Sequence, residues 1–286
     1  NSADLEIPGE KFGNSINLIN VRTPEAKTAL MNIGYSESQV RVYFELNMPC
    51  TDENGNRYVL NYTVNENGAK LNGFAETPET PVDMVIPKEI SDSGIVYPVK
   101  SIADSAFEGS AFVKTVVISE GIESIGSLAF KNMDSLTYAS VPGSVKGNLG
   151  SGVFKSCIFL KKCDLAEGIT VIPPEMFYNC QRLSSAVLPS TVSRINLGAL
   201  SAGTNRLKEV AILSESFVIN SGYLGESGRF DDNWGYIGTK WIVVNDDMKE
   251  LLESRISANP LYPQTVVVAA VSDPVVTFGN GILTIS

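Results

Sequence analysis

Cysteines and clustered carboxylates are the side chains of this sequence that could carry chemistry, because histidine is absent. Its absence excludes Ser-His-Asp and Cys-His catalytic arrangements and every His-ligated metal site. The four cysteines are Cys50, Cys157, Cys163 and Cys180. They form no Cys-x-x-Cys pair and are too few for a disulfide scaffold, so their spacing excludes the usual structural zinc site.

Three carboxylate clusters are candidates for catalytic or metal sites. Asp231–Asp232 and Asp246–Asp247 are only sequence neighbours, and Asn245 precedes the second pair at the start of a predicted helix, where it fits an N-cap. The turn at residues 52–54 lacks the ligand series of a calcium loop. With no nucleophile-base pair and no Gly-rich phosphate loop, we predict no enzyme, no cofactor and no metal site.

The element that must position any site is a repeat between Ile102 and Leu224. Each copy has a branched apolar residue, four variable residues and a bulky apolar residue. The copies start at Ile102, Ile125, Leu149, Ile172, Ile195 and Ile219, and end at Phe107, Phe130, Phe154, Phe177, Leu200 and Leu224. Successive starts are 23 or 24 residues apart by subtraction. A fixed period of this size predicts stacked repeats.

Other positions also recur every 23 or 24 residues, and we call each such set of equivalent residues a column. The columns distinguish residues that face inward from residues that face outward. The predicted strand of each copy alternates with period two. Inward pairs are Val116/Ile118, Ala139/Val141, Cys163/Leu165, Ala186/Leu188 and Val210/Ile212. Outward positions are Thr115, Val117, Tyr138, Ser140, Lys162, Asp164, Ser185, Val187, Glu209 and Ala211. Stacked turns would pair these strands in parallel, about 4.8 Å apart, and bring each Phe against its copies above and below.

Cys157 and Cys180 occupy the same slot of successive repeats. Stacking would bring their Cα atoms to roughly 5 Å, which is within disulfide range. Adjacent parallel strands give poor disulfide geometry, so buried free thiols are the favoured alternative. The sequence leaves both open.

The sequence divides into three predicted regions, at 1–80, 81–245 and 246–286. The middle region contains the repeats, and the other two flank it. The first has a short helix after Thr23-Pro24 that Gly34 ends, and a hairpin of strands 40–46 and 57–64 around Asn54-Gly55. The last has a helix, an apolar strand at 266–271, and a hairpin at 273–286 that either docks on the cap or begins another module.

The repeat resembles a known family. Val99-Lys-Ser-Ile-Ala-Asp-Ser-Ala-Phe107 and Ile118-Ser-Glu-Gly-Ile-Glu-Ser-Ile125 are similar to the BspA-like (treponemal-type) leucine-rich repeat, and Val141-Pro142 and Leu188-Pro189 keep its strand-ending proline. The similarity is strong over 84–213, weaker over 214–257 and absent from 1–48. Ser119 and Ala166 depart from the pattern.

The resemblance implies a right-handed, β-rich leucine-rich repeat solenoid with parallel strands and about 23 residues per turn, capped by an N-terminal β or α+β segment and a C-terminal strand-helix-strand. It further implies a secreted or surface-anchored bacterial protein that acts in adhesion or protein binding, with a lipid anchor on a removed N-terminal segment as one mode. It implies no enzyme, no cofactor and no shared set of ligand residues.

Charge and hydropathy restrict the partners. The chain carries a net charge of −10 and has a pI near 4.7, which disfavours nucleic acid and anionic lipid. No apolar window reaches the roughly 18 residues of a membrane span. The chain begins at Asn1, so we expect a mature or trimmed form.

Two surfaces are candidates for ligand binding. The outward strand positions include Tyr138, Lys162 and Asp164, which also fit an ordinary solvated strand. The second is the insertion at 225–241, whose aromatic residues suit sugar stacking or a protein contact, although a plug for the last turn is the favoured interpretation. These aromatics are Phe230, Trp234, Tyr236 and Trp241. Our leading hypothesis is a protein partner, of the host or otherwise; a glycan-binding module and a structural spacer are the alternatives.

Overall fold

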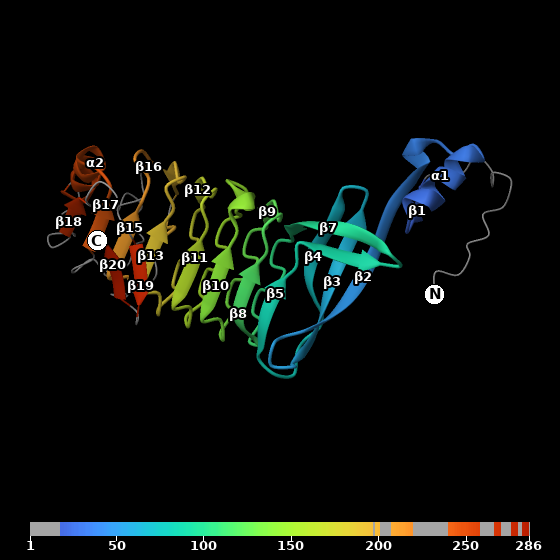
Figure 1. Cartoon of the computed structure of the whole chain (residues 1–286), viewed down its shortest axis with the longest axis horizontal. Coiled ribbons are helices and arrows are strands. Elements are labelled where there is room, and N and C mark those ends of the chain that lie inside the picture. Colours follow the sequence, from blue (N-terminus) through green and yellow to red (C-terminus); the bar gives the residue numbers. More distant parts are fainter. Residues whose placement is uncertain are drawn as a thin grey trace.

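The computed structural model describes residues 18–196, 198–200, 207–219, 240–257, 266–269, 276–279 and 282–285. It is an elongated, strand-rich molecule with mostly parallel sheets and few helices (Figure 1). The repeat turns follow one another along the long axis, and the N-terminal strands stand at one end of the row. This confirms the predicted class of β-rich repeat.

The N-terminal strands form a sheet that continues into the repeats. Its strands are β1 (Ile19–Val21), β2 (Val40–Thr51), β3 (Arg57–Asn65), β4 (Gly68–Glu76), β6 (Glu89–Asp92), β7 (Ile95–Ile102) and β9 (Ser124–Ile125). The predicted hairpin is confirmed as the antiparallel pair β2–β3. Strand β4 pairs in parallel with β7, whose last residue, Ile102, begins the first repeat motif, so the sheet crosses the predicted boundary near residue 80.

Gly73 shows how closely β4 approaches the first repeat. Its φ is +135°, and a Cβ built on it would lie 2.2 Å from the Ala106 carbonyl oxygen. Only glycine fits there. The neighbouring Phe74 then meets the Phe107 ring edge-on, with centroids 5.0 Å apart.

The short N-terminal helix forms as its sequence signals predict. Helix α1 spans Pro24–Asn32, and the Ala26 N–H donates to Thr23 Oγ1 at 3.1 Å. A 3-10 turn, η1 (Glu37–Gln39), follows before β2.

The strands that carry the outward columns lie in two parallel sheets. The first contains β5 (Val82–Ile86), β8 (Val113–Ile118), β10 (Tyr138–Val141) and β11 (Lys162–Leu165). The second contains β13 (Ser185–Leu188), β15 (Glu209–Ile212), β17 (Lys240–Val243) and β18 (Val266–Ala269). Tyr138 pairs with Lys162 and Ser140 with Asp164, so the predicted register is confirmed.

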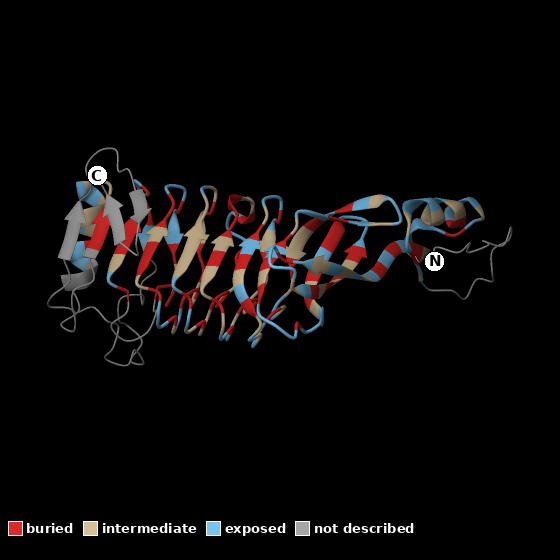
Figure 2. Ribbon diagram, turned by 60° about the horizontal axis from the view of Figure 1, so that its bottom comes forward, coloured by how far each residue is buried: buried red, intermediate tan, exposed pale blue. Residues whose placement is uncertain are grey.

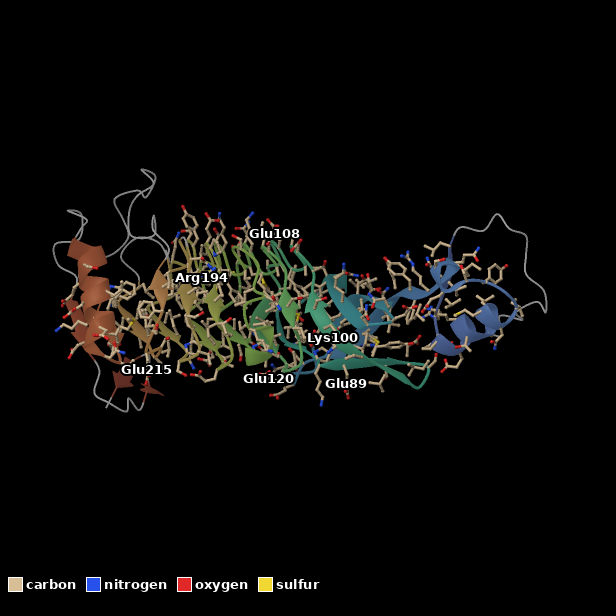
Figure 3. The ribbon with its side chains drawn as sticks, turned by 90° about the horizontal axis from the view of Figure 1, so that it is seen from above. Glu89, Lys100, Glu108, Glu120, Arg194 and Glu215 are labelled. Atoms are coloured by element: carbon tan, nitrogen blue, oxygen red, sulfur yellow. The ribbon has the colours of Figure 1, made fainter. Side chains whose placement is uncertain are left out.

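Shorter strands and turns complete each repeat. They are β9 (Ser124–Ile125), β12 (Val171–Ile172), β14 (Arg194–Ile195), β16 (Val218–Ile219) and the 3-10 turn η2 (Gly143–Val145). Figure 3 shows Glu108 on the side of the Phe-bearing turns, opposite Glu120 and Glu215.

Buried residues recur in every repeat turn along the molecule (Figure 2), and they belong to one continuous hydrophobic core. Phe107, Phe130, Phe154 and Phe177 stack nearly parallel, with centroid distances of 5.5, 5.4 and 6.1 Å. Cys157 and Cys180 are buried free thiols. Each donates from Sγ to the Phe carbonyl of an adjacent copy, Cys157 to Phe130 at 2.9 Å and Cys180 to Phe154 at 3.0 Å.

Two carboxylates that follow repeat strands each link their own turn to the next one. Glu120 accepts the N–H groups of Gly143 and Ser144, and Glu167 accepts those of Ser190 and Thr191. The hydroxyls of Ser144 and Thr191 donate to main-chain carbonyls of the preceding turn. Burial raises the pKa of Glu167, but these hydrogen bonds outweigh it, and the net pKa lies below the usual range.

The C-terminal elements also match their predictions. Helix α2 spans Asp246–Ser257, and the Asn245 side chain caps it by accepting the Met248 N–H at 2.9 Å. Strand β18 extends the second sheet in parallel with β17. Strands β19 (Val276–Gly279) and β20 (Ile282–Ile285) form the predicted antiparallel hairpin.

Candidate ligand-binding face

We define the strand face as the outward positions of β5, β8, β10, β11, β13, β15 and β17. Parallel pairing aligns them in two columns, because residues two apart on a strand lie on the same side of the sheet. One column runs from Asp83 through Tyr138 to Glu209. The other runs from Val85 through Ser140 to Ile242.

A polar cluster occupies the middle of this face. Asp164 Oδ2 accepts a hydrogen bond from the Tyr138 hydroxyl at 2.8 Å and forms an ion pair with Lys162 Nζ at 2.9 Å. Lys162 Nζ also lies 5.7 Å from the centroid of the Tyr138 ring. Burial and the bond to Asp164 raise the pKa of Tyr138, so its hydroxyl stays a donor at neutral pH. The structure therefore brings three of the predicted residues together.

Next to this cluster lies an apolar pair that the sequence analysis did not select. Val85 and Val117 are register partners, and 51% and 38% of their surfaces are exposed. The sequence did indicate this pair, because Val117 is at a predicted outward position of its strand. A β-branched apolar residue on the outer side of an alternating strand could have identified it.

The C-terminal part of the strand face differs from the expectation. Ala211 was predicted to point outward, and the register places it beside Val187 and Ile242 on that side. Yet Ala211 is fully buried and Ile242 is only 4% exposed. They form a small apolar cluster of their own, apart from the main core, with Val187 and Leu213 packed against it. Ser185, also predicted to point outward, is buried as well.

One of the four aromatic residues predicted to bind a ligand in the insertion at 225–241 is a core residue. Trp241 pairs in register with Val210 on the inward side of β17 and is 4% exposed, so its ring is part of the core and is no surface for a glycan. It was misassigned because a Trp beside a Gly-rich insertion looks like a binding residue until its strand register is known. Phe230, Trp234 and Tyr236 lie outside the described residues.

The hydrogen-bonded pairing of the strands is interrupted between β11 and β13, although the two strands remain neighbours. These strands end two separate sheets, while on the Phe-bearing side the same two turns stay bonded, for example from Phe154 N–H to the Met176 carbonyl at 3.0 Å. Along β11 even the inward Cys163 and Leu165 are partly exposed, although they pack against the core. The polar cluster therefore includes the last hydrogen-bonded strand of the first sheet, and β13 lies beside that strand.

Cys157 and Asp52, two other side chains that could carry chemistry, have structural roles. Burial raises the pKa of Cys157 to about 12, so this thiol stays protonated at neutral pH and is a poor nucleophile. Asp52 accepts hydrogen bonds from the N–H groups of Asn54, Asn56 and Asp83 and from the Asn56 side chain. Within the described ranges, no three Cys, Asp or Glu side chains gather as a metal site.

Comparisons with known proteins agree with the repeat assignment. The family model described as "BspA type Leucine rich repeat region" matches residues 99–227 in six copies. A comparison with curated proteins gives no match. None of the helices in the described part of the chain has the length and apolar character needed to cross a membrane.

Solved structures of bacterial leucine-rich repeat proteins are similar in part. The T. pallidum leucine-rich repeat protein is 17% identical, with 73% of this chain and 92% of that chain covered and a TM-score of 0.47. A leucine-rich cell surface protein from Faecalibacterium prausnitzii A2-165 is 18% identical, with 82% and 57% covered and a TM-score of 0.42. The pneumococcal vaccine antigen PcpA is 20% identical, with 59% and 51% covered and a TM-score of 0.41. The chain thus spans between half and three-fifths of the last two proteins.

Proposed function

Because residues 99–227 are a BspA-type leucine-rich repeat region, we propose that this chain binds a protein partner through the strand face over β5, β8, β10 and β11. Repeats of this kind serve protein binding or structural roles, and their stacked strands offer an extended surface. The observation that carries the proposal is the exposed pair Val85 and Val117 beside the Tyr138, Lys162 and Asp164 cluster.

This combination suits a protein partner. An apolar pair supplies area that gains free energy when it leaves water, while neighbouring polar groups fix orientation. Tyr138 offers a broad ring with a polar tip, which is the residue type enriched at energetic centres of interfaces. Asp164 is already engaged by Tyr138 and Lys162, so the cluster is held in place before a partner arrives.

We place the protein outside the bacterial cell or on its surface, as the repeat family implies, with adhesion as its role. A structural spacer is the next candidate, since a rigid row of turns can also present a neighbouring module. The glycan hypothesis loses support from the burial of Trp241.

The test is binding of the intact chain to a panel of purified extracellular matrix proteins and mucin glycans, measured by biolayer interferometry. We expect a protein ligand, and we expect Val85→Asp/Val117→Asp to weaken it at least about tenfold, because a carboxylate would be buried in an apolar contact. Val96→Asp is the matched control, since Val96 is 58% exposed on β7, away from the strand face. Unchanged binding by the double variant contradicts the proposed face, and binding to glycans alone favours the carbohydrate alternative.

A further inference from the structure

Strand β2 has an open sheet edge along its second half. In the described part of the chain, only β1 pairs with β2 on the side away from β3, and that pairing covers Val40–Val42 alone. Figure 1 shows β1 and α1 beside the beginning of β2, and the hairpin of β2 and β3 continues beyond them. The open edge is therefore bounded by β1 at one end and by the turn after Thr51 at the other.

The register of the hairpin determines which backbone groups face this edge. The Asp52 N–H donates to the Asn56 carbonyl at 3.0 Å, so these two residues form a hydrogen-bonded pair. Such pairs alternate along an antiparallel ladder, and no register shift interrupts the pairing of β2 with β3. The even-numbered residues of β2 therefore bond to β3. The odd-numbered residues direct their backbone groups toward the open edge, and they are Glu45, Asn47, Pro49 and Thr51.

The edge of β5, which lies near the same hairpin, is closed by side chains. The Asp83 N–H donates to Asp52 Oδ2 at 3.1 Å, and the Val85 N–H donates to the Tyr58 hydroxyl at 3.3 Å. The hairpin thus satisfies donors at the end of the first repeat sheet. Within the described ranges, no side chain bonds in this way to the odd-numbered residues at 45–51 of β2, so this edge needs a different partner.

A stripe of half-buried apolar side chains follows the same edge. On the inner face of the sheet, Leu46, Met48 and Cys50 are partly exposed although they pack against the core. Their register partners on β3 are buried, and they are Tyr62, Leu60 and Tyr58. The fully buried core therefore stops at β2. One further strand beside β2 would cover the stripe and pair the open backbone groups together.

We infer that β2 of a second copy of this chain occupies this edge, paired antiparallel about a two-fold axis at Met48. A two-fold contact requires a self-complementary surface, and β2 provides one. The Asn47 N–H of each copy donates to the Pro49 carbonyl of the other, so the proline takes part as an acceptor although it has no N–H. Glu45 lies opposite Thr51, so no like charges face each other.

Two limits select this register. An axis at Asn47 would bring the turn after Thr51 against Val21, which already lies beside Val42. An axis at Pro49 would place two prolines opposite each other, and neither has an N–H to donate. A further shift would pair only residues 49–51. The axis at Met48 lies between these limits.

This pairing covers the apolar stripe of one copy with that of the other. Residues that are opposite but not hydrogen-bonded have the closest side chains, so Met48 packs against its own counterpart and Leu46 packs against Cys50 of the second copy. The two N-terminal sheets become one continuous sheet. The inference is independent of the proposed function, because it rests on the edge of β2 and not on the strand face.

Disulfide cross-linking of the full-length chain tests the axis. In a Cys50→Ser background, Met48→Cys should form a linked dimer under mild oxidation, because the Cα atoms of such a pair lie about 4.5 Å apart. Val96→Cys in the same background is the control, since Val96 is 58% exposed on β7, away from this edge. Linking of Val96→Cys as readily as Met48→Cys would show random collision and would overturn the proposed axis.

Sedimentation velocity tests the pairing itself. The intact chain should form a reversible dimer, and Asn47→Pro should weaken it at least about tenfold, because each copy loses a hydrogen bond to the other. Asn47→Thr is the matched control, since it also removes the amide side chain but keeps the N–H, and it should dimerise like the unmodified chain. Pro49 already occupies an equivalent edge position, so the fold accommodates proline there, and circular dichroism verifies this. An intact chain that is monomeric at every concentration, or a dimer that persists in Asn47→Pro, overturns the inference.

Discussion

Phe130 and Phe154 stack with their ring centroids 5.4 Å apart and their planes 14° from parallel, although they lie 24 residues apart by subtraction. Both rings are fully buried. The backbone follows the same spacing, since the Phe130 N–H donates to the Val153 carbonyl at 2.9 Å. One repeat thus supplies the surface on which the next one packs, and this contact is the basis of the first prediction.

Replacing Phe154 by alanine should lower the free energy of unfolding by about 3–5 kcal/mol, because the ring contacts both Phe130 and Phe177 and a cavity would remain. Lys162→Ala is the control and should cost about 0–1 kcal/mol, since its ion pair with Asp164 is partly exposed. Urea unfolding measures both. A severe loss for Lys162→Ala with little change for Phe154→Ala would reverse the inward and outward assignments.

Gly143→Ala should be destabilising by about 1–3 kcal/mol, because the added Cβ would lie 1.8 Å from the Glu167 carbonyl oxygen of the next turn, and backbone cannot yield as a side chain can. Gly147→Ala in the same turn meets nothing closer than Thr170 Oγ1 at 3.2 Å and should stay within about 0.5 kcal/mol. Thermal unfolding of the two variants distinguishes them. Equal melting temperatures would contradict this prediction, because they would mean that adjacent turns can move apart without a loss of folding free energy.

Asp52 should contribute to the pH dependence of stability. The Asn56 side chain and the N–H groups of Asp83, Asn56 and Asn54 lower the pKa of Asp52 to about 2, against about 3.9 in an unfolded chain. The stabilisation is therefore present above about pH 4 and lost as the pH falls through about 2. Asp52→Asn should be less stable at neutral pH and lose less stability on acidification. The exposed Glu53→Gln is the control, and parallel pH profiles for Asp52→Asn and the unmodified chain would contradict the assignment.

Cys157 and Cys180 should remain unlabelled by iodoacetamide at mildly alkaline pH until the protein unfolds. Both thiols are fully buried, and burial raises their pKa values. The partly exposed Cys50 should react first. Peptide mass spectrometry after labelling reads each site separately. A disulfide-linked peptide that contains both Cys157 and Cys180 would refute the free-thiol state.

Much of the architecture could be predicted because the same pattern of residues occurs six times in the sequence. The period fixed which residues are register partners, such as Tyr138 and Lys162, and the alternation fixed which side they face. Local signals sufficed for the helix caps at Thr23 and Asn245, since a cap depends on residues three positions away. The candidate site was found in part, as the cluster of Tyr138, Lys162 and Asp164.

The remaining features depend on contacts that no periodicity encodes. The sequence by itself determined the stacking of the turns, the inward core and the outward columns, because each of these follows from a period of 23 or 24 residues. Only the tertiary structure decided that Ala211 is buried while Val117 is exposed, that Trp241 belongs to the core, and that hydrogen-bonded pairing stops between β11 and β13. The physical reason is that burial on an outward face depends on which distant segment packs there, and position within the repeat carries no information about that segment.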